Sequence, residues 1–209
     1  MRFSRLFITF SLLLCFGRAF AQNKGEPGHF DFYLLDIATG SDFCHVPGVE
    51  GPCMAPHTFV LHGLWPQNND GSYPVNCGAP SPLRHPESML RYTPNLALIQ
   101  HEWDKHGTCT TLTQTQYFAQ AVRLYQAFRI PAAFADRETL LSEEPGVILD
   151  AFRAANPQLP AESIVLGCNA RKELTQVAAC FTKDFQPTAC RNVHLCRETG
   201  PLTLPVTPR

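Results

Sequence analysis

The cysteines constrain the fold of this chain more than any other feature. Nine occur in 209 residues, and the first, Cys15, lies in an N-terminal segment with the composition of a signal peptide. That segment, residues 1–21, carries Arg2 and Arg5 near its start, continues with an apolar run at residues 6–16, and ends in an Ala-Phe-Ala motif. Small residues at these positions fit a signal-peptide cleavage site. We therefore expect the mature chain to begin at Gln22.

Removal of the signal peptide leaves eight cysteines. An even number in an exported chain predicts four disulfides, and the sequence alone leaves their pairing open. No two of them have the Cys-x-x-Cys spacing of a zinc or redox site. The eight are Cys44, Cys53, Cys77, Cys109, Cys168, Cys180, Cys190 and Cys196.

The mature chain, residues 22–209, has the length of one globular domain with its own core. No apolar run reaches the roughly 20 residues that cross a bilayer, so we expect a secreted or periplasmic protein without a membrane anchor. Loss of the three signal-peptide arginines leaves 14 basic residues against 18 acidic ones, a net charge of about −4. Proteins that bind polyanions through counterion release normally carry a basic excess. Any nucleic-acid contact is therefore expected inside a cleft, helped by protonated histidines.

The distribution of apolar residues predicts an α+β fold. Aromatic and aliphatic runs bounded by turn residues predict strands, and apolar residues at helical spacing predict helices. The expected strands are 30–37, a short strand at 58–61 that ends at His62, and further short strands within 163–196. The expected helices are 95–107, 116–128 and 147–156. This order is typical of a central antiparallel sheet with several helices.

Four ionisable side chains share one face of the helix predicted at 95–107: His101, Glu102, Lys105 and His106. At 100° per residue they lie within an arc of about 140°. Glu102 and His106 are four residues apart, which is contact distance on a helix. An ionised Glu102 would then raise the pKa of His106 and provide a general acid or base beside a cation.

The same segment has other interpretations. It could be an exposed helix face with ordinary ion pairs, as most charge runs are. A zinc site of the His-Glu-x-x-His type does not fit, because His101 and His106 are five residues apart rather than four. The sequence contains no Gly-x-Ser-x-Gly motif of a serine hydrolase. We expect Trp103 in the core and Asp104 in solvent.

A second candidate segment reads Phe-Val-Leu-His-Gly-Leu-Trp-Pro-Gln at residues 59–67. A lone histidine such as His62 at the end of an apolar strand is more often structural than functional. Gly63 permits close approach of another group to the backbone. Trp65 could either pack in the core or stack on a nucleic-acid base.

Residues 59–66 and 101–109 resemble, almost residue for residue, the two signature segments of the ribonuclease T2 family. The resemblance extends more weakly to residues 30–33 and to the cysteine layout, and so covers most of the mature chain. It implies a single disulfide-stapled α+β domain. It also implies an endoribonuclease that cleaves single-stranded RNA through a 2′,3′-cyclic phosphate, with low base specificity and with neither a metal nor a cofactor.

The resemblance also implies a role for each matched residue. His106 resembles the general base that deprotonates the 2′-OH, and His62 resembles the general acid that protonates the leaving 5′-oxygen. Glu102 and Lys105 match the residues that stabilise the pentacoordinate phosphorane, and His101 matches a phosphate-binding histidine. Because one histidine must be protonated, we expect mildly acid pH to favour activity.

Substrate contacts are implied for Trp65, which matches a base-stacking residue, and for Gln67, which stands where some family members have Asp. Residues 38–44 lack the Trp-Pro type segment common in the family, so the second base subsite is expected to differ. We expect the protein to be a monomer. An alternative is an exported RNA-binding or cell-surface protein that keeps the fold without catalysis, although a binder needs no acid-base pair.

Finally, the resemblance implies one set of disulfide pairings. These are Cys44–Cys53, Cys77–Cys109, Cys168–Cys196 and Cys180–Cys190. The second pair would tie the loop after His62 to the end of the helix that carries His106.

Overall fold

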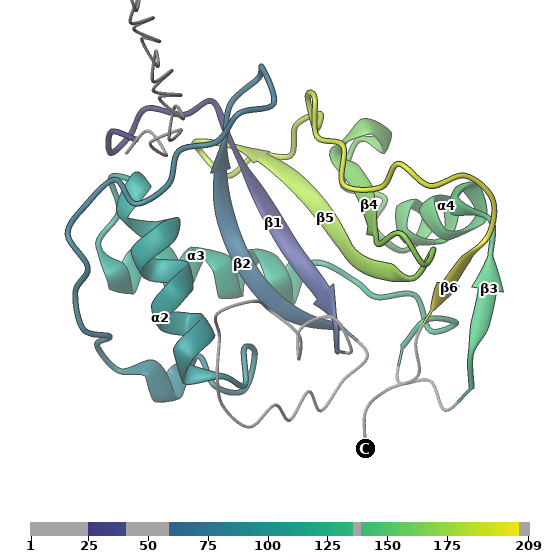
Figure 1. The fold of residues 1–209 in the computed structure, drawn as a ribbon, viewed down its shortest axis with the longest axis horizontal. Coiled ribbons are helices and arrows are strands. Elements are labelled where there is room, and N and C mark those ends of the chain that lie inside the picture. Colours follow the sequence, from purple (N-terminus) through teal and green to yellow (C-terminus); the bar gives the residue numbers. More distant parts are fainter. Residues whose placement is uncertain (1–24, 41–58, 136–138, 205–209) are drawn as a thin grey trace, which may run out of the picture.

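The computed structural model describes residues 25–40, 59–135 and 139–204 (Figure 1). Within them, four strands form an antiparallel sheet in the order β2-β1-β5-β4, and β3 pairs with β6 in a second antiparallel sheet. The strands are β1 (Phe32–Thr39), β2 (Phe59–Gln67), β3 (Leu141–Glu143), β4 (Ile164–Cys168), β5 (Leu174–Thr182) and β6 (Leu202–Leu204). The helices are α2 (Leu96–Lys105), α3 (Gln114–Ala127) and α4 (Pro145–Ala155), with 3-10 turns η1 (Pro86–Ser88), η2 (Gly107–Cys109) and η3 (Ala161–Ser163). The predicted α+β class with an antiparallel sheet is confirmed.

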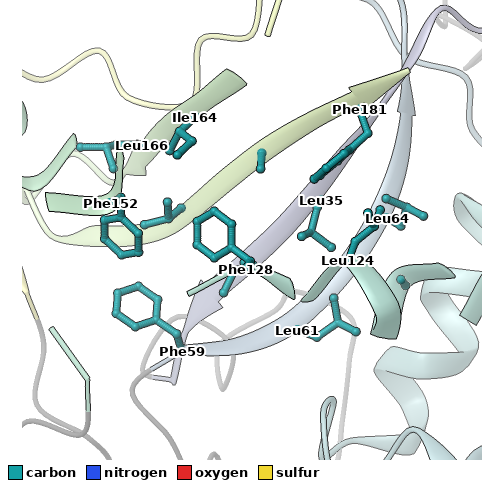
Figure 2. Packing of buried hydrophobic residues seen from close by; sticks show 14 of the residues in the cluster. Leu35, Phe59, Leu61, Leu64, Leu124, Phe128, Phe152, Ile164, Leu166 and Phe181 are labelled. Atoms are coloured by element: carbon teal, nitrogen blue, oxygen red, sulfur yellow. The ribbon is translucent and has the colours of Figure 1, made fainter. Parts of the chain in front are cut away.

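Three helices pack on the larger sheet. Helix α2 contacts β2, α3 contacts β2 and β1, and α4 contacts β4 (Figure 1). Apolar side chains from both layers meet between them, where the ring of Phe152 stacks on Phe128 and meets Phe59 edge-on (Figure 2). Phe152 is fully buried, and its truncation to Ala would cost about 3–5 kcal/mol. This core holds α2 and α3 against the strand that carries His62.

The other face of the sheet is also covered. Phe32 and Leu34 of β1 point into a smaller apolar cluster, which the segment containing Val193 and Leu195 covers. All eight residues of β1 are therefore buried. A strand buried on both faces reads as a continuous apolar run rather than as an alternating one, which explains its sequence.

The prediction that the second strand is short and ends at His62 was wrong. Strand β2 continues to Gln67 and stays paired with β1 over its whole length. Pro66 is compatible with this pairing because β2 is an edge strand of the sheet. An irregularity lies in the middle: Asp36 pairs with Gly63 and Ile37 pairs with Leu61, so His62 is an extra residue on β2. Such a β-bulge redirects the side chain of the inserted residue.

The three predicted helices are confirmed, with boundaries shifted by a few residues. Asn95 caps α2 by accepting a hydrogen bond from the backbone N–H of Leu98. Helix α3 starts earlier than predicted, because Thr113 and Gln116 form a reciprocal capping box around its first turn. The hydroxyl of Tyr117, on α3, donates a 2.9 Å hydrogen bond to the carbonyl of Leu64 and so fastens α3 to β2.

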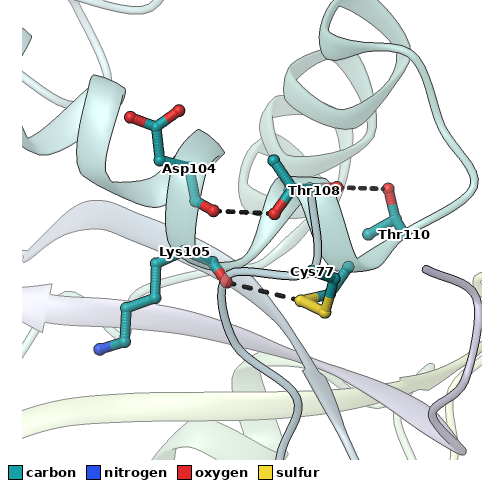
Figure 3. Close-up of a disulfide and its surroundings, with 7 residues drawn as sticks. Cys77, Asp104, Lys105, Thr108 and Thr110 are labelled. Atoms are coloured by element: carbon teal, nitrogen blue, oxygen red, sulfur yellow. Dashed lines mark hydrogen bonds between the residues drawn. A yellow bond between two sulfur atoms is a disulfide. The ribbon is translucent and has the colours of Figure 1, made fainter. Parts of the chain in front are cut away.

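Within the described residues, three disulfides form, and they are pairs that the resemblance implied: Cys77–Cys109, Cys168–Cys196 and Cys180–Cys190. The first joins the loop after β2 to η2, directly beyond α2 (Figure 3). Asn76 reinforces this link, because its backbone N–H donates a 2.9 Å hydrogen bond to the carbonyl of Lys105. Cys44 and Cys53 lie outside the described residues, and their pairing stays a prediction.

The signal peptide at 1–21 also lies outside the described residues and stays a prediction. The single domain at 22–209 stays a prediction as well. No helix in the described part of the chain is long and apolar enough to cross a membrane. Across those residues, no group of three or more His, Cys, Asp or Glu side chains is arranged to hold a metal ion.

Candidate active site

The β-bulge places His62 beside a carboxylate that the sequence analysis did not identify. Asp36, opposite the bulge on β1, has a completely buried side chain, and its Oδ2 lies 3.2 Å from Nδ1 of His62. The two atoms are at hydrogen-bond distance, although neither Asp36 oxygen nor His62 Nδ1 makes a well-aligned hydrogen bond. One sequence signal was present: Asp36 is the sole charged residue in β1.

A second carboxylate approaches the other ring nitrogen of His62. Oε1 of Glu102, on α2, lies 3.5 Å from Nε2 of His62. Oε2 of Glu102 accepts a 2.6 Å hydrogen bond from the indole Nε1 of Trp65. Gly63 makes this approach possible, because a Cβ at that position would overlap the Glu102 carboxylate.

The indole of Trp65 also connects the two histidines. Its ring stacks on His106 with centroids 5.1 Å apart and an interplanar angle of 23°, and it meets His62 edge-on at the same centroid distance. His106 follows α2 directly as its C-cap residue. The structure therefore gathers His62, Trp65, Glu102 and His106 into one continuous cluster.

The two carboxylates keep His62 protonated. Burial alone would lower its pKa, but the interactions with Asp36 and Glu102 outweigh burial and raise the pKa to about 10. Burial raises the pKa of Glu102, yet His62, His106 and the hydrogen bond from Trp65 lower it below its ordinary value. Burial raises the pKa of Asp36, and His62 opposes that rise.

His106 behaves in the opposite way. Burial lowers its pKa to about 3, and the Coulombic attraction of Glu102 does not compensate. Glu102 does raise the pKa of His106, as expected, but burial lowers that pKa by more. The other interpretation, an exposed helix face with ordinary ion pairs, was wrong for these two residues, because both side chains are buried and form no ion pair within 4 Å among the described contacts. His106 is therefore a neutral base.

The other residues of the α2 face lie at the margin of this cluster. His101 is half-buried, and burial lowers its pKa. Lys105 is partly exposed and close enough to His106 to lower the pKa of that histidine. In Figure 3 the Lys105 side chain extends away from the neighbouring disulfide.

The two remaining residues of the segment have structural roles. Trp103 packs against the core, as predicted, with its ring edge-on to Tyr117. Asp104 was expected in solvent, but it is half-buried and accepts hydrogen bonds from Ser81 and Gln100. It anchors the segment after β2 against α2.

Gln67 lies apart from the acid-base cluster. Its side chain lines a cavity of about 520 Å³ at the end of β2, together with Tyr73, His194 and Arg197. Tyr73 is 53% exposed and offers an aromatic surface there. The C-terminal part of this lining was not predictable from the sequence, because no pattern in residues 190–197 shows that they fold back towards β2.

In the cluster of His62, Trp65, Glu102 and His106, a protonated imidazole meets the indole edge-on and a neutral imidazole stacks on it. The buried carboxylate of Glu102 contacts both the indole and the protonated imidazole. A donor and an acceptor of one proton each are what concerted general acid-base catalysis requires.

The sequence matches the Ribonuclease T2 family over residues 30–190. Ribonuclease DdI of Dictyostelium discoideum is 36% identical over 182 residues, which cover 77% of this chain and 78% of that protein. A ribonuclease of Aeromonas hydrophila is 35% identical over 145 residues, and the match covers 68% of this chain but 60% of that relative.

Solved structures show the same fold. An RNase-related protein from Calystegia sepium superposes with a TM-score of 0.68 at 22% identity and covers 86% of this chain and 98% of its own. A variant of RNase MC1 in complex with 5′-UMP superposes with a TM-score of 0.62 at 25% identity, covering 79% and 96%. On the family match and the Dictyostelium relative, the chain belongs to the ribonuclease T2 family of endoribonucleases.

Proposed function

We propose that the protein cleaves single-stranded RNA by metal-independent transphosphorylation, with low base specificity. The observation that carries this proposal is the pair of opposed histidines: the pKa of His62 is raised to about 10, and that of His106 is lowered to about 3. At any pH between these two pKa values, His62 is protonated and can donate a proton, while His106 is neutral and can accept one. RNA supplies the matching groups, a 2′-OH to deprotonate and a 5′-oxygen to protonate.

In the first step, Nε2 or Nδ1 of His106 removes the proton of the 2′-OH. The 2′-oxygen then attacks the neighbouring phosphorus, and the bond from phosphorus to the 5′-oxygen breaks as His62 gives that oxygen a proton. In the second step a water molecule attacks the 2′,3′-cyclic phosphate. The roles are now reversed, with His62 accepting the proton of water and His106 returning one to the 2′-oxygen.

Negative charge accumulates on the non-bridging oxygens of the pentacoordinate phosphorane. We assign its stabilisation to Lys105 and Glu102, the first by direct positive charge and the second by holding the protonated His62 in place. His101, on the same face of α2, is assigned to the binding of a substrate phosphate.

Base contacts are assigned to the region around Trp65 and Gln67. Gln67 and Tyr73 line the same cavity, where an amide and an exposed ring can contact a base without requiring one particular sequence. Trp65 is engaged by Glu102 and His106, so any stacking on a base uses the part of the ring that these contacts leave open.

A secreted or periplasmic location agrees with the signal peptide predicted at 1–21 and with the disulfides, which persist in oxidising compartments. The related tomato proteins include one named extracellular and one named intracellular. We propose that this chain is exported and acts as a monomer.

The test uses purified mature protein, single-stranded RNA and EDTA. The proposal predicts cleavage that EDTA does not inhibit, and no cleavage at a position that carries a 2′-deoxy sugar. Inhibition by EDTA that zinc reverses would contradict it. Binding of RNA without any product would favour the alternative of a binding protein that has lost catalysis.

A further inference from the structure

Asp36 is a buried charged group with no function in the mechanism described so far. Its side chain has no exposed surface, its Oδ2 lies 3.2 Å from Nδ1 of His62, and neither carboxylate oxygen makes a well-aligned hydrogen bond. Burying a carboxylate without such bonds is costly. In native structures an unsatisfied buried group of this kind calls for an explanation, which is often catalytic. Its one ion-pair partner among the described residues is His62.

We propose that Asp36 is a positioning residue: its carboxylate holds the Nδ1–H of His62, so that the Nε2–H of the same ring faces the leaving oxygen of the substrate. This inference rests on the proposed function, because it takes His62 as the general acid. Asp36 does not touch substrate, since it is completely buried behind the imidazole.

The geometry favours this division between the two ring nitrogens. Nδ1 lies 3.2 Å from a carboxylate that is fixed in the central region of the sheet, whereas Nε2 lies 3.5 Å from Glu102. The looser Nε2 contact leaves that proton available to a substrate oxygen. A carboxylate at Nδ1 fixes the tautomer and stabilises the imidazolium, as in the general logic of Asp-His pairs.

The β-bulge is the backbone feature that creates the pair. His62 is the extra residue between Leu61 and Gly63, opposite Asp36 and Ile37. Without the bulge, the pleat would place successive side chains on alternate faces with no extra residue to redirect. Asp36 and the bulge therefore form one unit that aims His62.

Several ionisable groups face His62 and contribute to its protonation. Asp36 comes from β1, and the other elements packed against the imidazole contribute from α2 and α3. The ionisable neighbours from these elements are Asp36, Glu102, His101, His106 and Tyr117. Of them, Asp36 and Glu102 are the two that raise the pKa of His62. Removal of the Asp36 charge alone should leave a smaller rise that Glu102 maintains.

The decisive variant is Asp36→Asn, which keeps the shape of the side chain and removes its charge. The charge-matched control is Asp150→Asn, on the exposed surface of α4. For each protein the ring nitrogens of His62 are titrated by NMR, and kcat and KM are measured against pH on a short RNA.

We expect Asp36→Asn to lower the pKa of His62 by about one to three units and to shift the alkaline limb of the kcat/KM profile to lower pH by the same amount. We expect kcat to fall about tenfold or more, while KM stays close to that of the wild type and Asp150→Asn changes neither quantity.

The inference is overturned if His62 has the same pKa in Asp36→Asn as in the wild type and the alkaline limb of kcat/KM does not move. If that variant does not fold, the wild-type spectrum decides. At about pH 8, where an ordinary histidine is neutral, His62 must carry a proton on Nδ1, and its absence overturns the inference. If the wild type cleaves no RNA, the proposed function fails separately, because the NMR titration still reports whether Asp36 holds His62.

Discussion

The indole nitrogen of Trp65 donates a 2.6 Å hydrogen bond to the carboxylate of Glu102. The same ring stacks on His106 and meets His62 edge-on. Trp65 therefore fixes the position of Glu102 and buries His106, in addition to any contact with a base. Trp65 is the side chain that contacts both His62, the proposed acid, and His106, the proposed base.

Trp65→Phe keeps an aromatic ring but removes the hydrogen-bond donor. A hydrogen bond to a charged group contributes about 1.5–3 kcal/mol, so we expect kcat to fall by about one to two orders of magnitude. If Trp65 served mainly to stack on a base, KM would rise and kcat would change little. Steady-state kinetics on RNA separate the two outcomes.

Gly63→Ala should disable the site through a local clash. The added Cβ would overlap the carboxylate of Glu102 and lie 2.6 Å from Nε1 of Trp65. Overpacking of this kind costs about 1–3 kcal/mol, and displacement of Glu102 would also lower kcat. The matched control is Gly146→Ala, where a new Cβ meets nothing within 4 Å. Thermal unfolding and kcat are measured for both, and wild-type activity in Gly63→Ala would refute the contact.

Replacement of both Cys77 and Cys109 by Ser should reduce stability and activity together. The sequence separation of 32 residues predicts a loss of about 3.7 kcal/mol by the chain-entropy model, and a Tm lower by about 10 °C. Because Cys109 lies just beyond His106, kcat should fall even at temperatures where the variant is folded.

The matched control for that prediction is the double replacement of Cys180 and Cys190. Its separation of 10 residues predicts a smaller loss, about 2.7 kcal/mol. Cys180 lies on β5, which β1 separates from the strand of His62 in the sheet order, and no described contact joins this pair to His62 or His106. Equal falls of kcat in the folded forms of the two variants would show that the first disulfide has no special effect on the site.

Activity should depend little on pH over a wide range. His106 must be neutral, so kcat/KM rises as pH increases through its pKa of about 3. His62 must be protonated, so kcat/KM falls as pH increases through its pKa of about 10. We expected mildly acid pH to favour activity because one histidine must be protonated; the two pKa values predict a broad plateau that includes mildly acid pH. A pH profile whose alkaline limb lies near the ordinary histidine value of 6.5 would show that the carboxylates do not hold the proton on His62.

Local sequence patterns predicted the helices well, because spacing and caps are local properties. Asn95 and Thr113 stand where an N-cap is needed, and the apolar residues at helical spacing in α3 pack against the core beside the buried Tyr117, Ala121 and Leu124. Strand β2 was predicted too short, because Gly63 and Pro66 are strand-breaking residues in isolation. Their tolerance depends on an edge position and a bulge, which arise from pairing with β1.

The members of the site were largely predictable, but their electrostatics were not. The sequence placed Glu102 and His106 four residues apart and so indicated a mutual ion pair, whereas burial against Trp65 governs the pKa of His106. Asp36 escaped notice because its partner is 26 positions away in the sequence, and the pair exists through strand register. The protonation state of a buried group depends on its desolvation, and residue spacing in the sequence does not show how deeply a side chain is buried.

The central claim, that His106 is the base and His62 the acid, is tested most directly with two RNA substrates. One has the natural 5′-oxygen as its leaving group, and the other has a leaving group so acidic that it departs without a proton. We predict that His62→Ala loses about 10² to 10⁴ in kcat on natural RNA and recovers most of that loss on the activated substrate, whereas His106→Ala is inactive on both. Recovery of His106→Ala on the activated substrate, with His62→Ala inactive on both, would contradict the account.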